Sequence, residues 1–405
     1  MKRRALFIYT HPSTFVKGDI TILKKRYDVT EYCLKNQPKK VLPFSLIKQF
    51  FFLLFNIYRY DIVYIWFADY HSLFPVLFSR FTGKKSFLVI GGYDVCREKQ
   101  YGYGSFSNKL RGSFAYLSIR YATQNLCVSK NIERIVSAIV PKSNHTTVYN
   151  GVSIKTEFDG TQDKERIVLC VALVSTLQAF YIKGIDRYNS LAKEMGDTHF
   201  TLVGCNPDIF EKAGIKKAEN LRVIPALEHS KLALLFSKAK VYCQLSRRES
   251  FSLALAEAMY HNCIPVITHT GGMPEVTGGL GYCINPEASS NTAYSVNPEA
   301  TGNTTYCVNP DDAGNTAPHV STKSTGSPTQ FHNQRSTGYT AKSFNPEITG
   351  NTAYCVNPDF TLSLADAVRE ALEEPLNTTF RKQIEQNFSA SHREQAISDQ
   401  LLSRN

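Results

Sequence analysis

The residues best suited to chemistry lie in one segment of the 405-residue chain, around two glutamates, Glu249 and Glu257. A short apolar strand is expected to end just before Glu249, and a helix is expected to begin near Phe251. The amide groups at that helix start, near Ser252 and Leu253, would attract an anion such as a diphosphate. Glu257 lies further along the same helix and could accept hydrogen bonds from a ribose diol.

A glycine pair forms a second loop downstream. The backbone at Gly271 and Gly272 can approach a ligand closely, because neither residue carries a side chain. Each feature alone also fits a surface helix with two exposed glutamates. Their order and spacing together favour a binding site.

The elements that must position these residues alternate between short apolar strands and helices. This alternation predicts an α/β protein made of two Rossmann-like, doubly wound parallel-sheet domains in succession. Ligands of such folds bind at the carboxyl ends of the strands and in the cleft between domains. Strands are expected at 5–10, 27–33, 61–66, 85–90, 166–171, 199–203, 221–224, 240–243 and 263–268, and helices at 17–25, 74–81 and 185–194.

Four regions are expected along the chain. They are an acceptor-side domain at 1–155, a donor domain at 160–282 and 354–375, a repeat array at 283–358, and C-terminal helices at 376–405 that return to the first domain.

The repeat array has a period of 12 residues and a unit close to TGNTAYCVNPEA. Deleting 72 residues, or six units, would join Cys283 directly to Val356. The array is therefore interpreted as an amplified loop within an ordinary domain. Both disorder and a β-solenoid fit its composition, and a longer surface loop adds little closure entropy.

Charge is distributed unevenly over the chain. The net charge is +11, and residues 1–150 hold 23 Lys and Arg against 8 Asp and Glu. This favours an anionic partner for the first half, such as a membrane surface, although solubility explains it equally well. No nucleic-acid-binding motif accompanies the charge, so nucleic acid is not an expected partner.

The remaining composition indicates an ordinary globular protein. Hydrophobic residues make up 43%, which excludes collagen-like and wholly disordered chains. No apolar run is long enough for a transmembrane helix or a signal peptide, and the ten cysteines show no zinc-site spacing. A cytoplasmic protein is expected, either free or peripheral to the inner face of the membrane.

The segment from Phe44 to Arg59 is apolar and aromatic, with basic residues at Lys48 and Arg59. It is interpreted either as a buried helix of the first domain or as a face that dips into a membrane to meet a lipid-linked acceptor.

The combined motifs resemble family-4 (group 1) glycosyltransferases of the GT-B fold. The resemblance covers most of residues 1–282 and 354–405 and is weaker in the N-terminal half. Ser252 departs from the family pattern, which has a glycine there. The matching residues are Glu249, Phe251 and Glu257 (E-x-F-G-x-x-x-x-E), Pro265 and Val266 (G-x-P-V), Gly271, Gly272 and Glu275 (G-G-x-x-E), Lys183 to Asp186 (K-G-I-D), Asn150 to Val152 (N-G-V), and Cys127 to Ser129.

The resemblance implies a retaining, metal-independent glycosyltransferase without a cofactor. It would transfer a sugar from a nucleoside diphosphate sugar to a glycan or lipid-linked acceptor, in the synthesis of a cell-surface polysaccharide, lipopolysaccharide or glycolipid. The roles it implies are catalytic for Glu249, Asp94 and Lys183, donor-binding for Glu257, Ser252, Leu253, Gly271, Gly272, Lys183 and Arg247, and acceptor-side for His11 and Gly18.

Two departures leave alternatives open. The family has an arginine shortly before the lysine, whereas residues 171–176 contain none, so Arg247 is expected to substitute. Many relatives have a histidine near the position of Asp94. A degenerate copy that binds a nucleotide sugar without turnover, or a nucleotide-sugar epimerase of similar fold, would also fit the sequence.

Overall fold

The structure is a computed structural model that describes all residues except 1, 36–40, 153–162, 286–291, 297–355 and 404–405; the side chains of 292–296 and 356–362 also lie outside the description. Most of the repeat array expected at 283–358 falls outside these residues, so the predictions for it stay predictions. The description below concerns the unit formed by Met1–Val296 and Asn357–Asn405.

The N-terminal domain is built on a six-stranded sheet with the order β2-β1-β3-β4-β5-β6. Every strand pair in it is parallel. The bounds are β1 Arg3–Tyr9, β2 Tyr27–Cys33, β3 Ile62–Trp66, β4 Lys85–Ile90, β5 Gln124–Cys127 and β6 His145–Thr147.

The second sheet has eight strands in the order β14-β13-β12-β11-β10-β7-β8-β9. The strands from β12 to β9 pair in parallel, and β13 pairs with β12 in the antiparallel direction. The bounds are β7 Glu165–Val174, β8 His199–Cys205, β9 Leu221–Ile224, β10 Ala239–Gln244, β11 Ile264–Thr268, β12 Tyr282–Ile284, β13 Thr292–Val296 and β14 Val356–Ser363.

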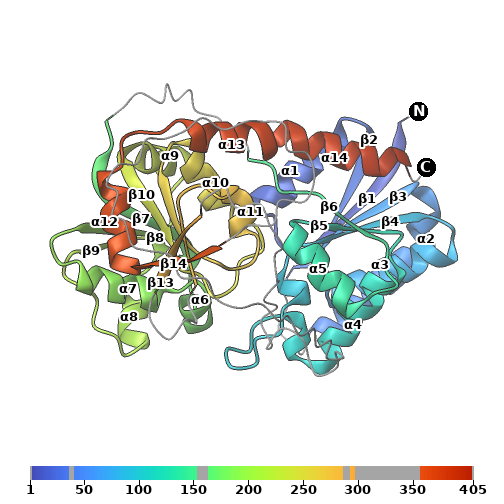
Figure 1. The fold of residues 1–405 in the computed structure, drawn as a ribbon. Helices are drawn as coiled ribbons and strands as arrows, with labels where there is room; N and C mark the ends of the chain where they lie inside the picture. The colour runs from blue at the N-terminus through green and yellow to red at the C-terminus, as the bar shows by residue number, and fades with distance from the viewer. Residues whose placement is uncertain (1, 36–40, 153–162, 286–291, 297–355, 404–405) are drawn as a thin grey trace, which may run out of the picture. The chain divides into compact units, whose positions relative to one another are not determined.

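Helices cover both faces of each sheet (Figure 1), which confirms the doubly wound α/β prediction. The first domain contains α1 Thr14–Lys24, α2 Leu42–Asn56, α3 Tyr70–Phe81, α4 Lys109–Tyr121, α5 Lys130–Ile139 and the 3-10 turns η1 Ile57–Arg59, η2 Tyr93–Val95 and η3 Ser105–Ser107. The second contains α6 Leu177–Ile182, α7 Ile185–Glu194, α8 Asp208–Lys212, α9 His229–Lys238, α10 Leu253–Tyr260, α11 Met273–Thr277 and α12 Leu364–Glu373. Two further helices, α13 Thr379–Asn387 and α14 Ala390–Ser403, follow.

The strands are short apolar runs because helices bury both of their faces. All five residues of β3 and of β11 are buried, as expected for central strands of a parallel sheet. The polar residues that matter for chemistry therefore come after the strands, where the chain leaves the core.

The last helix is held on the N-terminal domain by a buried ion pair. The Arg393 guanidinium on α14 contacts both carboxylate oxygens of Asp19 on α1 at 2.7 Å, and both side chains are almost fully buried. Tyr64 and Trp66 each donate a hydrogen bond to the same carboxylate at 2.9 Å. In Figure 1, α13 and α14 run from the second domain to the first.

We expect Arg393→Met to lower the free energy of unfolding by about 3–5 kcal/mol, because it leaves the Asp19 carboxylate buried without its cation. The control is Lys25→Met, which removes a partly exposed ion pair between Lys25, the residue directly after α1, and Glu394 on α14. That change should cost less than about 1 kcal/mol. Denaturant unfolding of both variants measures these free energies. Equal losses of unfolding free energy would show that the buried Asp19–Arg393 pair stabilises the fold no more than the partly exposed pair does.

Candidate functional site

An ion pair stands at the carboxyl edge of the second sheet. Lys183, which follows α6, places its Nζ 2.7 Å from Oε2 of Glu249, in the loop between β10 and α10. Gln244, the last residue of β10, donates to the same oxygen at 2.8 Å. Both side chains of the pair retain some exposure. Glu249 is therefore oriented by two donors and still accessible to a ligand.

The helix start expected near Phe251 is found at Leu253, with Ser252 as the N-cap. The Ser252 hydroxyl accepts from the Leu255 amide at 3.3 Å and donates to Gln244 Oε1 at 2.7 Å. Its φ of +73° is in the left-handed region, which a glycine would adopt without strain. The first-turn amides of Leu253 and Ala254 have no acceptor inside the helix and remain suited to an anion.

Glu257 lies one turn further along α10, largely buried. Burial raises its pKa, and the imidazole of His229 on α9, whose Nε2 is 3.3 Å from Glu257 Oε1, acts in the opposite direction. The ribose-binding role given to Glu257 stays a prediction. Its carboxylate is placed on the same helix as the candidate anion site.

The glycine pair after β11 packs against the loop that carries Glu249. A Cβ added to Gly271, whose φ is +61°, would lie 1.5 Å from the Glu249 carbonyl oxygen, and one on Gly272 would lie 2.3 Å from that of Ser250. The close approach that requires these glycines is therefore to the chain's own backbone. The sequence interpretation assigned it to a ligand, and the geometry favours a supporting role.

Arg247 forms a bidentate ion pair with Asp186. Its guanidinium donates two hydrogen bonds of 2.7 Å to Asp186 on α7 and one of 2.7 Å to the Tyr181 carbonyl. Asp186 belongs to the K-G-I-D motif, so this clamp joins that motif to the loop after β10. The geometry argues against Arg247 as a substitute for the family's diphosphate-binding arginine.

Asp94 is fully buried at the start of η2. Its carboxylate accepts hydrogen bonds from the amides of Ala68, Gly91 and Gly92 at 2.6–3.1 Å, and burial raises its pKa to about 6. A carboxylate enclosed in this way holds the turn after β4. This placement favours a positioning role over the predicted contact with a donor sugar.

The carboxyl edges of the two sheets contact each other through loops. The Glu275 carboxylate on α11 accepts from the amides of Lys130 and Asn131 at the start of α5, and from the Tyr149 hydroxyl, at 2.7–2.9 Å. A Cβ on Gly92 would lie 2.1 Å from the Ser250 hydroxyl oxygen. Glu275, singled out only as part of a motif, thus bridges the two domains.

The two acceptor-side residues lie apart from these contacts. His11 is exposed in the loop after β1. Gly18 lies on the exposed face of α1, which begins at Thr14, three residues earlier than predicted. The acceptor-side role given to His11 and Gly18 stays a prediction.

Two contributing residues have weak signals in the sequence. Gln244 orients Glu249 and Ser252, and a polar residue that ends a buried strand was the available hint. His229 pairs with Glu257 from 28 positions away, and no motif marks it.

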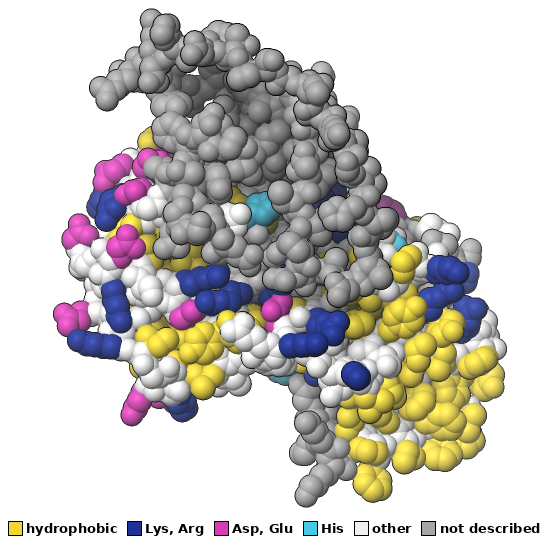
Figure 2. Space-filling view, turned by 60° about the horizontal axis from the view of Figure 1, so that its bottom comes forward, with side chains coloured by type: hydrophobic (Ala, Val, Ile, Leu, Met, Phe, Trp, Pro, Cys, Tyr) yellow, Lys and Arg dark blue, Asp and Glu magenta, His cyan; other side chains and the backbone are white. Residues whose placement is uncertain are grey.

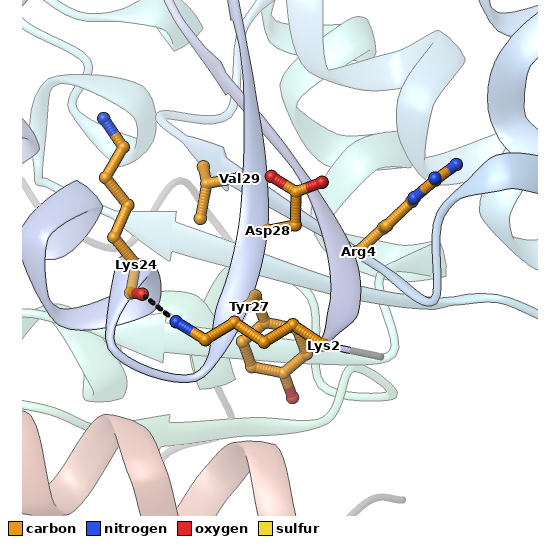
Figure 3. Close-up of a pocket in the computed structure, with 6 residues that line it drawn as sticks. All are labelled: Lys2, Arg4, Lys24, Tyr27, Asp28 and Val29. Atoms are coloured by element: carbon orange, nitrogen blue, oxygen red, sulfur yellow. Dashed lines mark hydrogen bonds between the residues drawn. The ribbon is translucent and has the colours of Figure 1, made fainter.

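A shallow pocket lies at the opposite, amino edge of the first sheet (Figure 3). Lys2 Nζ there donates to the Lys24 carbonyl at 3.4 Å. The pocket is separate from the candidate site, because β1 and β2 begin there. Its lining is Lys2, Arg4, Lys24, Tyr27, Asp28 and Val29.

Among the described residues, no cluster of three or more His, Cys, Asp or Glu side chains could hold a metal ion. Nor does any helix in the described part of the chain have the length and apolarity to cross a membrane.

Comparison with known proteins places a recognised domain over the candidate site. Residues 160–295 match the family model described as glycosyl transferases group 1. A human phosphatidylinositol N-acetylglucosaminyltransferase subunit is 23% identical over 186 residues, which are 44% of this chain and 38% of that protein. The match thus spans well under half the length of this curated relative.

Solved structures show the GT-B fold. Sucrose-phosphate synthase from Thermosynechococcus elongatus superposes with a TM-score of 0.65 at 12% identity, over 100% of both chains. A UDP-forming trehalose-phosphate synthase from Burkholderia vietnamiensis gives 0.60 at 10% identity, over 99% of this chain and 100% of that one. A lipopolysaccharide outer core galactosyltransferase gives 0.52 at 16% identity, over 71% and 87%. The predicted fold is confirmed.

We expect Ser252→Ala to lower the free energy of unfolding by about 1 kcal/mol, because it removes the cap of α10 and keeps a Cβ at positive φ. Ser252→Gly removes the same cap but also relieves the backbone, so it should be close to neutral. Thermal and denaturant unfolding of both variants tests this order. An alanine variant as stable as the glycine variant would contradict it.

A second expectation concerns pH. The pKa of Asp94 in the folded protein, about 6, exceeds that of an unfolded aspartate. The folded state therefore binds the extra proton, and stability falls as pH rises from about 4 to above 6, by up to about 3 kcal/mol from this group. Asp94→Asn should lack this component. Unfolding free energies of both proteins across that range measure it, and parallel pH profiles would refute it.

Proposed function

We propose that this chain is a retaining glycosyltransferase that takes its sugar from a nucleoside diphosphate sugar. The observation that carries the proposal is the Lys183–Glu249 ion pair beside the start of α10, with Glu257 on the same helix. These groups lie within the region that matches the glycosyl transferases group 1 family.

The geometry suits departure of a diphosphate. Negative charge develops on the leaving diphosphate as the bond to the anomeric carbon breaks, and the α10 amides and Lys183 would stabilise it. Glu249, held by Lys183 and Gln244, would accept hydrogen bonds from hydroxyls of the donor sugar. Glu257 would bind the ribose. No metal ion is needed in this scheme, since the helix start and the lysine supply the positive charge.

The acceptor would approach from the basic N-terminal domain, whose loops after β1 and β4 face the same edge. A glycan or lipid-linked acceptor of a cell-surface polysaccharide, lipopolysaccharide or glycolipid is proposed. Support comes from two of the similar proteins, whose names refer to phosphatidylinositol and to the lipopolysaccharide outer core.

One observation favours a second candidate, a copy that binds a nucleotide sugar without transferring it. Where the family has its arginine, this chain has an exposed Leu173 near the end of β7 and a helix-capping Thr176 just after it, and Arg247 is engaged by Asp186. Less cationic charge would then face the leaving diphosphate. An epimerase of similar fold is a further alternative.

Calorimetric titration with UDP, GDP and ADP and their common sugar conjugates tests the donor site. We expect one nucleotide to bind, and expect Lys183→Ala and Glu257→Ala each to weaken it about 10–100-fold through a lost charged hydrogen bond. The matched control is Glu219→Ala, an almost fully exposed carboxylate on the second domain, which should leave binding unchanged.

Product analysis separates the candidates. Transfer to an added acceptor with the anomeric configuration of the donor retained supports the proposal. A changed sugar without an acceptor would identify an epimerase, tight binding without turnover would identify the degenerate copy, and no nucleotide binding would overturn all three.

A further inference from the structure

The helical layer formed by α2, α3 and α4 carries no acidic residue. The three helices pack side by side on the first sheet and comprise 40 residues without a single Asp or Glu. They do contain basic residues, and those that are exposed include Lys48, Arg80 and Lys109. Arg59 in η1, directly after α2, is exposed as well. A solvated helix surface ordinarily mixes both signs of charge, so this layer is unusual.

The same layer exposes large apolar side chains. Only Gln49 and Leu53 of the 15 residues in α2 are buried, whereas Phe44 is 72% exposed and Phe55 is 70% exposed. Phe81, at the end of α3, is 83% exposed. The exposed apolar residues of the layer are Phe44, Ile47, Phe50, Phe51, Leu54, Phe55, Phe81, Leu110 and Tyr116, and Tyr58 of η1 is exposed beside them. Most of the apolar segment from Phe44 to Arg59 is therefore helical, but its helix α2 is largely exposed, unlike the buried helix that one interpretation of the sequence expected.

Figure 2 shows hydrophobic side chains gathered over the N-terminal domain, with Lys and Arg beside them. A contiguous apolar area of this kind on a folded protein indicates a contact surface. Aromatic and aliphatic side chains together with basic ones suit the boundary between lipid headgroups and acyl chains.

We propose that the α2–α4 layer docks the protein on an anionic lipid bilayer, with the aromatic side chains of α2 entering the headgroup region. Charge decides between this occupant and a second copy of the chain. Two copies meeting through this face would bring two basic, acid-free surfaces together, which like-charge repulsion opposes. An anionic leaflet attracts the same surface. This inference is independent of the proposed glycosyl transfer.

Tryptophan fluorescence of the full chain tests insertion directly. The natural protein has one tryptophan, Trp66, which is buried and gives a constant background. In Phe55→Trp, emission should shift to the blue when phosphatidylcholine vesicles with about one third phosphatidylglycerol are added, as the indole enters the interface. In the control Leu234→Trp, on exposed α9 of the second domain, emission should stay unchanged.

Co-sedimentation with the same vesicles tests the charge. Lys48→Glu combined with Arg59→Glu should weaken binding at least about 10-fold, because two attractive charges become repulsive. The control is Lys193→Glu with Lys216→Glu, two exposed lysines of the second domain, which should change binding less than about twofold. Circular dichroism establishes that each variant is folded.

Three results would overturn the proposal. The first is equal binding to vesicles with and without phosphatidylglycerol. The second is an equal fluorescence shift for Leu234→Trp. The third is a dimer in analytical ultracentrifugation without lipid that dissociates in Phe55→Ser, which would assign the face to a second copy of the chain.

Discussion

The path of the backbone from Glu249 to Ser252 is the constraint on which the candidate site depends. Gly271, whose missing side chain leaves room for the Glu249 carbonyl, packs against it, and Gly92 of the first domain lies against the Ser250 side chain. Ser252 completes the path with a left-handed conformation and caps α10. Because the loop is enclosed by other backbone, the carboxylate of Glu249 and the start of α10 are presented in a fixed relation.

Much of the architecture could be predicted from the sequence, because each buried strand is a short apolar run bounded by polar or turn-forming residues. Strands β2, β4 and β9 and helix α7 have the predicted bounds. The motif residues Lys183 and Glu249, 66 positions apart, come together because both follow strands of one parallel sheet. The antiparallel pairing of β13 with β12 was not foreseen, since it lies beside the repeats.

What the sequence could not supply is the partner of each charged side chain. Glu275 belongs to a motif of the second domain, yet its carboxylate binds amides of the first. Asp94 follows a strand, as catalytic residues in such folds often do. Its carboxylate is nevertheless buried in the turn, where it accepts hydrogen bonds from three backbone amides. Such partners depend on how loops from distant strands meet, and spacing along the chain carries no information on that. The exposure of α2 was equally open, because an apolar run fits a core and an interface alike.

The buried pair between Asp19 and Arg393 has a consequence for how the protein is made. The two residues are 374 positions apart, so at ordinary rates of translation the cation is synthesised about 20–75 s after the carboxylate. During that interval the first domain can form its sheet but must keep this carboxylate hydrated or protonated. The buried pair can therefore form only after α14 has been synthesised, so the first domain completes its core last at the contact with this helix.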